Sequence, residues 1–281
     1  MPSRRQIHQT PPETSSSRVI HLPASDFHNC SALCSYINER IPQSKEDTKF
    51  TLTEVNSTWA DEMLRVLGET RLRIRFEFDT TTQILQLRIM ISEIHNAAQL
   101  WYQAAWMYWM ASGLTTRDES MDIRGLGVGM GSLSGSGVDK APYFMVRPRR
   151  SRIPRVVFES GWSESLDDLH SDINKWLVGG DGAVQVVILL KWSKVESSNR
   201  VRGSVELYTL ARDGTPKLQQ REQIFPIPAE PDTQPIRLTR RMLFGSNIAP
   251  GRNPQDAFAL DVAVLRADAV DLLERMNRVP A

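Results

Sequence analysis

Apolar and polar residues alternate most regularly between residues 71 and 91. The apolar positions of the first half are Leu72, Ile74, Phe76 and Phe78, and charged residues, mostly arginines, stand between them. A period of two residues is typical of a half-buried strand. The pattern therefore predicts a strand with one basic face, a turn at 80–82, and a partner strand at 84–91.

Other segments repeat with a helical period. We expect helices at about 30–40, 59–67, 92–110, 165–178 and 266–277, with Ser57 and Ser92 as N-caps of the second and third. The 92–110 helix is predicted to bury one side, made of Ala97, Leu100, Trp101, Ala104, Ala105 and Tyr108.

The segment 184–190 is nearly all apolar, which is how a central strand covered on both faces reads. Further strands are expected at about 143–146, 156–158, 205–210, 223–227 and 235–244. These elements predict an α/β (α+β) fold with a mixed sheet flanked by helices. Residues 1–18 are polar and are predicted to be a disordered tail, with a single domain at 19–281.

Composition narrows the possible partners and compartments. The chain has 281 residues, 41% of them hydrophobic, and a net charge of +1, so any basic surface must be local. No apolar run approaches the roughly 18 residues of a spanning helix, so no membrane partner is expected. The two cysteines, Cys30 and Cys34, stand four residues apart in an expected helix and are interpreted as reduced thiols. This predicts an intracellular protein of the cytoplasm or nucleus.

A glycine-rich segment spans residues 125–137. A phosphate-binding loop is one interpretation, but the spacing fits neither G-x-G-x-x-G nor G-x-x-x-x-G-K-[ST], and the G-x-S-x-G elbow has Leu133 where its serine belongs. A flexible loop is the favoured interpretation.

From Ser92 onward the expected order is helix, glycine-rich loop, strand, strand, helix, buried strand. The most specific residues in it are the run Glu-Ser-Gly-Trp-Ser-Glu-Ser at 159–165, preceded by Lys-Ala-Pro-Tyr at 140–143 and followed by Asp172 and Trp176. This stretch, about residues 88–195, resembles the core of the PD-(D/E)XK nuclease-like superfamily. Within it, the stretch is similar to fungal proteins related to the Uma-type restriction endonucleases.

The resemblance implies an α-β-β-α-β core in which an Asp and a Glu on adjacent strands hold Mg²⁺ and a Lys orients the attacking water. Glu159 matches the Glu position. Tyr143 stands where the Asp follows Pro142, and Gly161 stands where the superfamily has its Lys. A neutral phenol is a poor ligand for Mg²⁺. The resemblance therefore implies a pseudo-nuclease with a degenerate active site, without a metal cofactor, that acts as a binding or interaction module.

Two alternatives remain open. In the first, Mg²⁺ is bound by a rebuilt acid set, Glu93, Asp139 and Glu159, and the protein is an active endonuclease. In the second, the cleft serves small-molecule chemistry with Tyr143 and Glu159 as acid and base. For Glu159 itself, a role in a helix cap or an ion pair competes with a role in a site. His95 and His170 lie on expected helices and are interpreted as surface or packing residues.

Five arginines occur within nine residues next to this region: Arg147, Arg149, Arg150, Arg152 and Arg155. Such a run is able to bind the phosphates of a nucleic acid, although a solvated turn is the simpler interpretation. Nucleic acid is the partner that the sequence favours.

Overall fold

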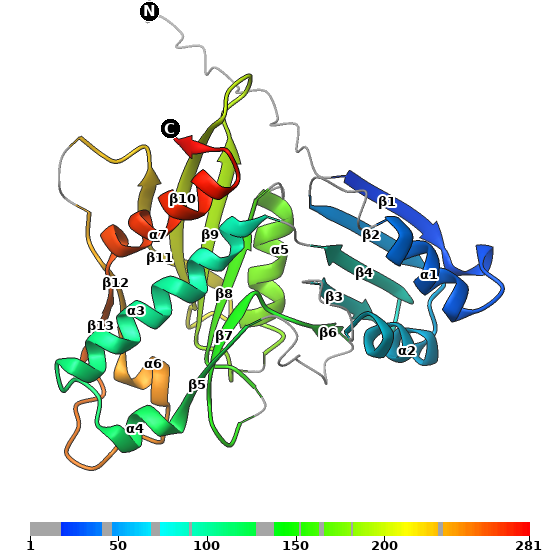
Figure 1. Ribbon diagram of the computed structural model, residues 1–281. Coiled ribbons are helices and arrows are strands. Elements are labelled where there is room, and N and C mark those ends of the chain that lie inside the picture. The colour runs from blue at the N-terminus through cyan, green and yellow to red at the C-terminus, as the bar shows by residue number, and fades with distance from the viewer. Residues whose placement is uncertain are drawn as a thin grey trace, which may run out of the picture.

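In the computed structural model of the protein, two lobes lie side by side, each built on its own β-sheet (Figure 1). The structure describes residues 18–40, 47–68, 74–89, 92–127, 138–151, 153–162, 166–180, 182–229 and 233–281. The expected tail lies outside these ranges apart from Arg18, and so does most of the glycine-rich segment, residues 128–137. The chain is a mixed α/β protein, as expected.

The small lobe comes mainly from the first part of the chain. Its elements are β1 (Arg18–Pro23), η1 (Ala24–Asp26), α1 (Cys30–Arg40), β2 (Thr48–Thr53), α2 (Ser57–Gly68), β3 (Ile74–Asp79) and β4 (Ile84–Ile89). A fifth strand, β6 (Val138–Lys140), pairs antiparallel with β3, which gives the sheet order β1-β2-β4-β3-β6. The small lobe is therefore completed by a segment that follows it in the chain by about fifty residues.

The two faces of the small-lobe sheet differ in character. The face under α1 and α2 is apolar, with Leu33, Phe50 and Leu85 almost fully buried (Figure 1). The opposite face carries a cross-strand row of three cations, since Lys49 pairs with Arg88 and Arg88 pairs with Arg75. Of the arginines predicted for this face of the 71–78 strand, Arg75 lies on it and is only 3% exposed because this face meets the large lobe, and Arg71 and Arg73 lie outside the described residues.

The large lobe holds the rest of the chain. Its helices are η2 (Glu93–Asn96), α3 (Ala97–Ala111), α4 (Arg117–Asp122), α5 (Leu166–Leu177), α6 (Arg240–Phe244) and α7 (Val262–Arg275). Its strands are β5 (Ile123–Gly127), β7 (Phe144–Pro148), β8 (Val156–Gly161), β9 (Val186–Lys194), β10 (Arg200–Leu210), β11 (Pro216–Phe225), β12 (Ile236–Thr239), β13 (Ala257–Leu260) and β14 (Val279–Pro280).

The main sheet of the large lobe has the order β11-β10-β9-β8-β7-β5, with β14 beside β10. Strands β8 and β9 are parallel and are joined through α5, whereas the other neighbours along this path are antiparallel. Helices α3 and α7 cover one face, and α5 covers the other (Figure 1). The prediction that 184–190 forms a central strand next to that of Glu159 is confirmed, because β9 lies between β8 and β10 and is buried from Val186 to Leu190.

The predicted helix at 92–110 begins differently from expectation. A single 3-10 turn, η2, precedes α3, and the Ser92 hydroxyl donates to Asp47 instead of capping the turn. The prediction that Leu100 and Tyr108 are buried is wrong, since they are 38% and 67% exposed. The side of α3 that packs on the sheet is rotated around the helix axis relative to the predicted side. It consists of Ala98, Trp101, Tyr102, Ala105 and Trp109.

Smaller differences have local causes. Helix α2 starts at Ser57, and its cap is the side chain of Asn56, which accepts from the Trp59 amide. The expected strand at 235–244 divides into β12 and α6, because Thr239 forms a capping box that starts the helix. Cys30 and Cys34 are buried free thiols in α1, and burial raises the pKa of Cys30 to about 12.

Candidate functional site

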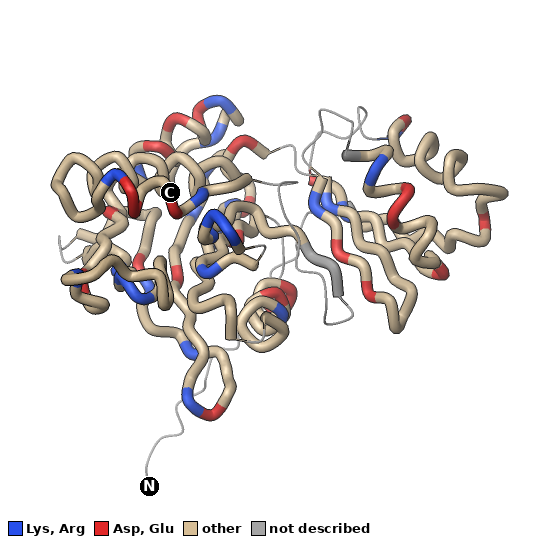
Figure 2. Tube along the Cα trace, turned by 90° about the horizontal axis from the view of Figure 1, so that it is seen from below, with Lys and Arg blue, Asp and Glu red and all other residues tan. Residues whose placement is uncertain are grey.

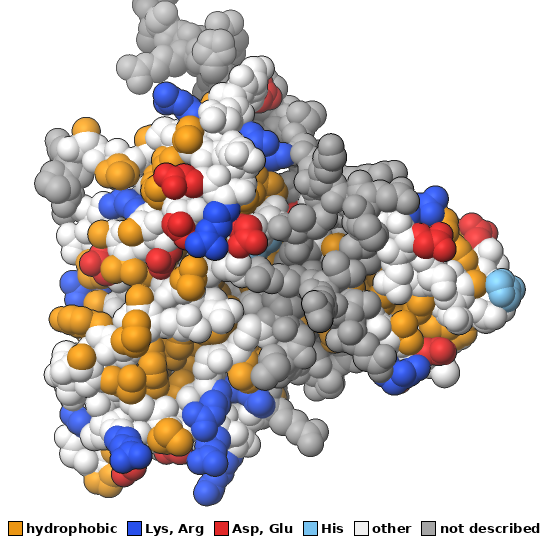
Figure 3. All heavy atoms as spheres, viewed as in Figure 1, with side chains coloured by type: hydrophobic (Ala, Val, Ile, Leu, Met, Phe, Trp, Pro, Cys, Tyr) orange, Lys and Arg blue, Asp and Glu red, His pale blue; other side chains and the backbone are white. Residues whose placement is uncertain are grey.

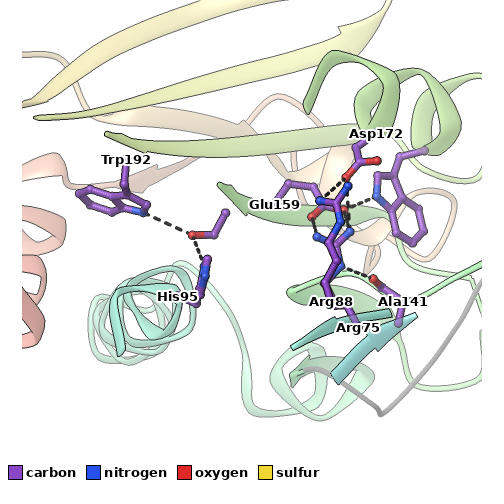
Figure 4. A network of polar contacts seen from close by, with 9 residues as sticks. Arg75, Arg88, His95, Ala141, Glu159, Asp172 and Trp192 are labelled. Atoms are coloured by element: carbon purple, nitrogen blue, oxygen red, sulfur yellow. Dashed lines mark hydrogen bonds and ion pairs between the residues drawn. The ribbon is translucent and has the colours of Figure 1, made fainter. Parts of the chain in front are cut away.

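Glu159 lies on β8 and points toward α5 and the small lobe, where its carboxylate is fully buried. Arg75 of β3 pairs with both carboxylate oxygens, from Nη2 to Oε1 at 3.0 Å and from Nη1 to Oε2 at 2.9 Å. The indole Nε1–H of Trp176 on α5 also donates to Oε1. Figure 4 shows Arg75 reaching across from the small lobe to Glu159. Oε1 therefore accepts two hydrogen bonds, and Oε2 is held by the ion pair with Arg75.

Further charges extend this cluster along α5. Asp172 lies 3.5 Å from Arg75 Nη2 and 3.9 Å from Arg88 Nη1 (Figure 4). Lys175, one turn further along α5, pairs with Glu77 of β3. The cluster therefore joins α5 and β8 of the large lobe to β3 and β4 of the small lobe.

The electrostatics of the cluster keep Arg75 charged. Burial alone would lower the pKa of Arg75, but the charges of Glu159 and Asp172 outweigh this effect and raise the pKa. The neighbouring Lys49 lacks so close an anion, and burial, aided by Arg88, lowers its pKa. We call the group of Arg75, Arg88, Glu159 and Asp172 the interlobe clamp.

Tyr143 immediately precedes β7 and is 6% exposed. Its ring stacks on His95 with centroids 4.6 Å apart, and the Arg75 guanidinium lies 4.5 Å from the ring centroid. Burial raises the pKa of the Tyr143 phenol, and the charge of Arg75 only partly opposes this. Tyr143, at the position where the resemblance implies an Asp, is thus a neutral aromatic residue that packs beside the interlobe clamp.

His95, expected to be a surface or packing residue, lies in a buried chain of hydrogen bonds. Its Nδ1 is 3.2 Å from Ser160 Oγ, and its Nε2 is 2.8 Å from Asp47 Oδ2. Trp192 Nε1–H donates to the same serine hydroxyl at 3.3 Å (Figure 4). The order Ser, His, Asp resembles a hydrolase triad, but Ser160 is 0% exposed and faces the core under α3. This series of hydrogen bonds therefore connects β8 to Asp47 inside the protein.

The other two residues of the rebuilt acid set belong to other elements than β8. Glu93 is in η2 and accepts a hydrogen bond from Asn96 at 3.3 Å. Asp139 is in β6, where its backbone pairs with Phe78, so its strand belongs to the small-lobe sheet and not to the sheet of Glu159. Within the described ranges, no three His, Cys, Asp or Glu residues are grouped so as to hold a metal ion.

The arginine run surrounds the turn between β7 and β8. Arg149 and Arg150 are exposed, Arg147 and Arg155 are half-buried, and Arg152 lies outside the described residues. Arg147 donates to Ser151 O at 2.7 Å and Arg155 to Met242 O at 3.3 Å. Arg155, at the end of the turn, precedes Glu159 by four residues, which is about 13 Å along the strand at 3.3 Å per residue.

A small hollow at the lobe interface is lined by Arg75, Phe76, Glu77, Gln86 and Arg88. Tyr143 and Glu159 do not line it. Their positions are therefore set by contacts within the protein, and the hollow opens onto the basic row of the small lobe.

Comparison with protein-family models gave no match, and comparison with curated proteins gave none either. No helix in the described part of the chain has the length and apolar character needed to cross a membrane.

Proposed function

We propose that the protein is a nuclease-fold binding module whose ancestral catalytic site has become a structural joint. The observation that carries this proposal is the state of Glu159, which is fully buried and is held by Arg75 and Trp176. The order α3, α4, β5, β6, β7, β8, α5, β9 supports the nuclease-like core, since it contains the implied α-β-β-α-β order with α4, β5 and β6 as additional elements. Fold resemblance alone does not determine activity, so the argument rests on the residues of the site.

A hydrolytic Mg²⁺ site needs carboxylates with free lone pairs and open positions for water and phosphate. Glu159 offers no open position, because it is fully buried and ion-paired with Arg75. Mg²⁺ would be required under the alternative in which Glu93, Asp139 and Glu159 form a rebuilt acid set, and the backbone position of β6 argues against that set. The acid–base alternative is disfavoured because Tyr143 and Glu159 are both closed to solvent.

Nucleic acid is the partner that we propose, bound through the arginines of the β7–β8 turn. Exposed Arg149 and Arg150 support this, since guanidinium groups pair well with phosphate oxygens. The protein would act inside the cell, in the cytoplasm or nucleus, a setting that suits the free thiols of Cys30 and Cys34.

The proposed loss of catalysis at Glu159 is tested by measuring metal binding and DNA cleavage with the full chain. We expect no micromolar Mn²⁺ binding by calorimetry and no cleavage of plasmid DNA in Mg²⁺ or Mn²⁺. Glu159→Gln is expected to lower thermal stability and to leave both of these readouts at background. Glu119→Gln is the matched control, because Glu119 is another buried carboxylate, paired with Arg240 inside the large lobe.

Micromolar Mn²⁺ binding that disappears in Glu159→Gln but persists in Glu119→Gln would contradict the proposal and favour an active nuclease. Tyr143→Asp adds the acid that the resemblance implies. Because Arg75 still occupies Glu159, we expect this variant to gain no cleavage activity.

A further inference from the structure

Six arginines gather at the end of the large lobe that holds the β7–β8 turn. Besides Arg147, Arg149, Arg150 and Arg155, the group includes two arginines from other segments. These are Arg124 of β5 and the exposed Arg241 of α6. Figure 3 shows basic side chains collected over the lower end of this lobe, and Figure 2, viewed from below, shows basic positions grouped there along the trace. We call these six residues the arginine end.

Arg124 and Arg147 are direct partners on the antiparallel strands β5 and β7. Like charges placed opposite each other across a strand pair destabilise a sheet. The Arg147 side chain is also incompletely satisfied, since its Nε is buried with no hydrogen-bond partner in the structure. Two cations are therefore held side by side with one donor left unused.

Arg155 also lies within the electrostatic influence of another arginine, Arg241. The Arg155 guanidinium packs on α6, donating to Met242 O, beside the conformationally permissive Gly245. Burial, and after it the charge of Arg241, lowers the pKa of Arg155. The crowding at Arg155 is independent of the pair on β5 and β7, yet it lies at the same end of the sheet.

Among the described acidic residues, none forms an ion pair with any member of the arginine end. Asp122, which immediately precedes β5, contributes its backbone carbonyl, which accepts from the Arg149 amide. Among the other described residues, the buried guanidinium groups of Arg75 and Arg240 are paired with carboxylates, which distinguishes them from the arginine end. Its positive charge is available to an anion from outside.

We propose that the arginine end binds the sugar–phosphate backbone of a nucleic acid duplex without reading its sequence, and that Arg124 and Arg241 belong to this surface. This inference rests on the proposed function as a nucleic-acid-binding module. The ligand is a phosphate chain because all six cations are arginines, whose planar forks match phosphate oxygens, and because they surround a turn instead of lining a pocket.

A duplex fits better than a single strand. Proteins that bind single strands combine a basic groove with aromatic side chains on which bases stack. The segment 147–155 contains no aromatic residue. Arg155 of this surface is also about 13 Å from Glu159 along the strand, at 3.3 Å per residue, so this duplex would lie away from the interlobe clamp.

The test is fluorescence anisotropy with a labelled 20-base-pair DNA duplex, the matching RNA duplex and the single DNA strand, across a salt series. For six phosphate contacts, the slope of log affinity against log salt is expected to be about −5. In Arg124→Gln/Arg241→Gln, that slope should flatten by about two units, equally for unrelated duplex sequences. The single strand should bind more weakly than either duplex.

The matched control is Arg200→Gln/Arg202→Gln, which removes two exposed arginines at the start of β10, the opposite end of the large lobe. It should keep the slope of the unmodified protein. Thermal unfolding of both double variants checks that they are folded.

Three outcomes would overturn the inference. If the duplex binds but Arg124→Gln/Arg241→Gln keeps the full slope, the surface is wrong while nucleic-acid binding stands. If neither duplex nor single strand binds at about 50 mM salt, the proposed surface and the nucleic-acid part of the proposed function are both wrong. The proposed loss of catalysis at Glu159 is still tested separately by the metal-binding and cleavage assay. If vesicles containing phosphatidylserine bind and nucleic acids do not, the surface belongs to a membrane.

Discussion

The two ends of the seven-stranded sheet hold charged side chains under opposite conditions. At the Glu159 end, each acid is buried against a cation from the other lobe, as in Arg75 with Glu159 and Lys175 with Glu77. At the arginine end, Arg124 is paired across the strands with Arg147, and the charge of Arg241 helps burial to lower the pKa of Arg155, with no described acid in an ion pair. The Glu159 end has ion pairs between the lobes, and the arginine end has no such ion pair among the described residues.

This difference separates attachment from recognition. A buried charge is costly unless it is paired, so the Glu159 end has little capacity left for a ligand. Uncompensated surface charge costs less in water, and its repulsion is relieved when an anion binds. The end that resembles a nuclease site therefore holds the lobes together, and the opposite end is the better place to look for a ligand.

The largest effect is expected from breaking the interlobe clamp. Arg75→Met should lower the free energy of unfolding by about 3–5 kcal/mol, because it leaves Glu159 and Asp172 as buried carboxylates with one cation removed. Urea unfolding followed by tryptophan fluorescence measures the change. Arg212→Met, at the exposed β10–β11 turn, is the control and should change stability by less than about 0.5 kcal/mol.

The double variant Arg75→Met/Glu159→Leu sharpens this test. Replacing both members of a buried pair with apolar residues is often nearly neutral, so part of the lost stability should return. If the free energy of unfolding of Arg75→Met lies within about 1 kcal/mol of that of the unmodified protein, the clamp contributes little to stability. The contrast between the two ends would then disappear.

A smaller effect is expected from the hydrogen-bond chain beside the clamp. Ser160→Ala leaves Trp192 Nε1–H and His95 Nδ1 without their shared hydroxyl, which should cost about 1–3 kcal/mol. Urea unfolding measures the change in stability, with Ser193→Ala as the control because Ser193 is a half-exposed serine at the end of β9. A neutral Ser160→Ala would show that the chain from β8 to Asp47 does not stabilise the joint.

The smallest effect, opposite in sign, is expected at the arginine end. Arg124→Glu replaces a like-charge pair across β5 and β7 with an opposite-charge pair, so stability should rise by about 0.2–1 kcal/mol. The gain should shrink in high salt, because exposed charges are screened. Arg202→Glu is the control. A loss of stability in Arg124→Glu would mean that Arg124 is not repelled by Arg147.

The elements that carry the site could be predicted from the sequence to a useful degree. The apolar run at 184–190 identified a central strand, and the helical spacing around Trp176 identified α5, because both patterns depend on local periodicity. The position of Asp139 could not be predicted, since a three-residue strand carries too little pattern to show which of two sheets it joins.

The role of Arg75 was also beyond sequence reasoning. Alternation along β3 correctly placed Arg75 on the face opposite Phe78, and a basic strand face is normally solvated. What buries Arg75 is the docking of a second lobe through Glu159 and Asp172, residues 84 and 97 positions away. One available signal was Glu159 itself, a carboxylate in an apolar strand, which needs a cation from somewhere in the chain.

The pairing of β6 with β3 bears on how this protein divides into pieces. Because β6 comes from the stretch between β5 and β7, the polypeptide passes from the small lobe to the large lobe, returns for one short strand, and leaves again. A fragment ending near residue 90 would lack this returning strand. It would expose the backbone edge of β3 together with the cations of Arg75 and Arg88, and an open strand edge promotes self-association. The small lobe therefore includes a strand from the chain segment that also builds the large lobe, and we expect that neither lobe can be expressed alone as a stable fragment.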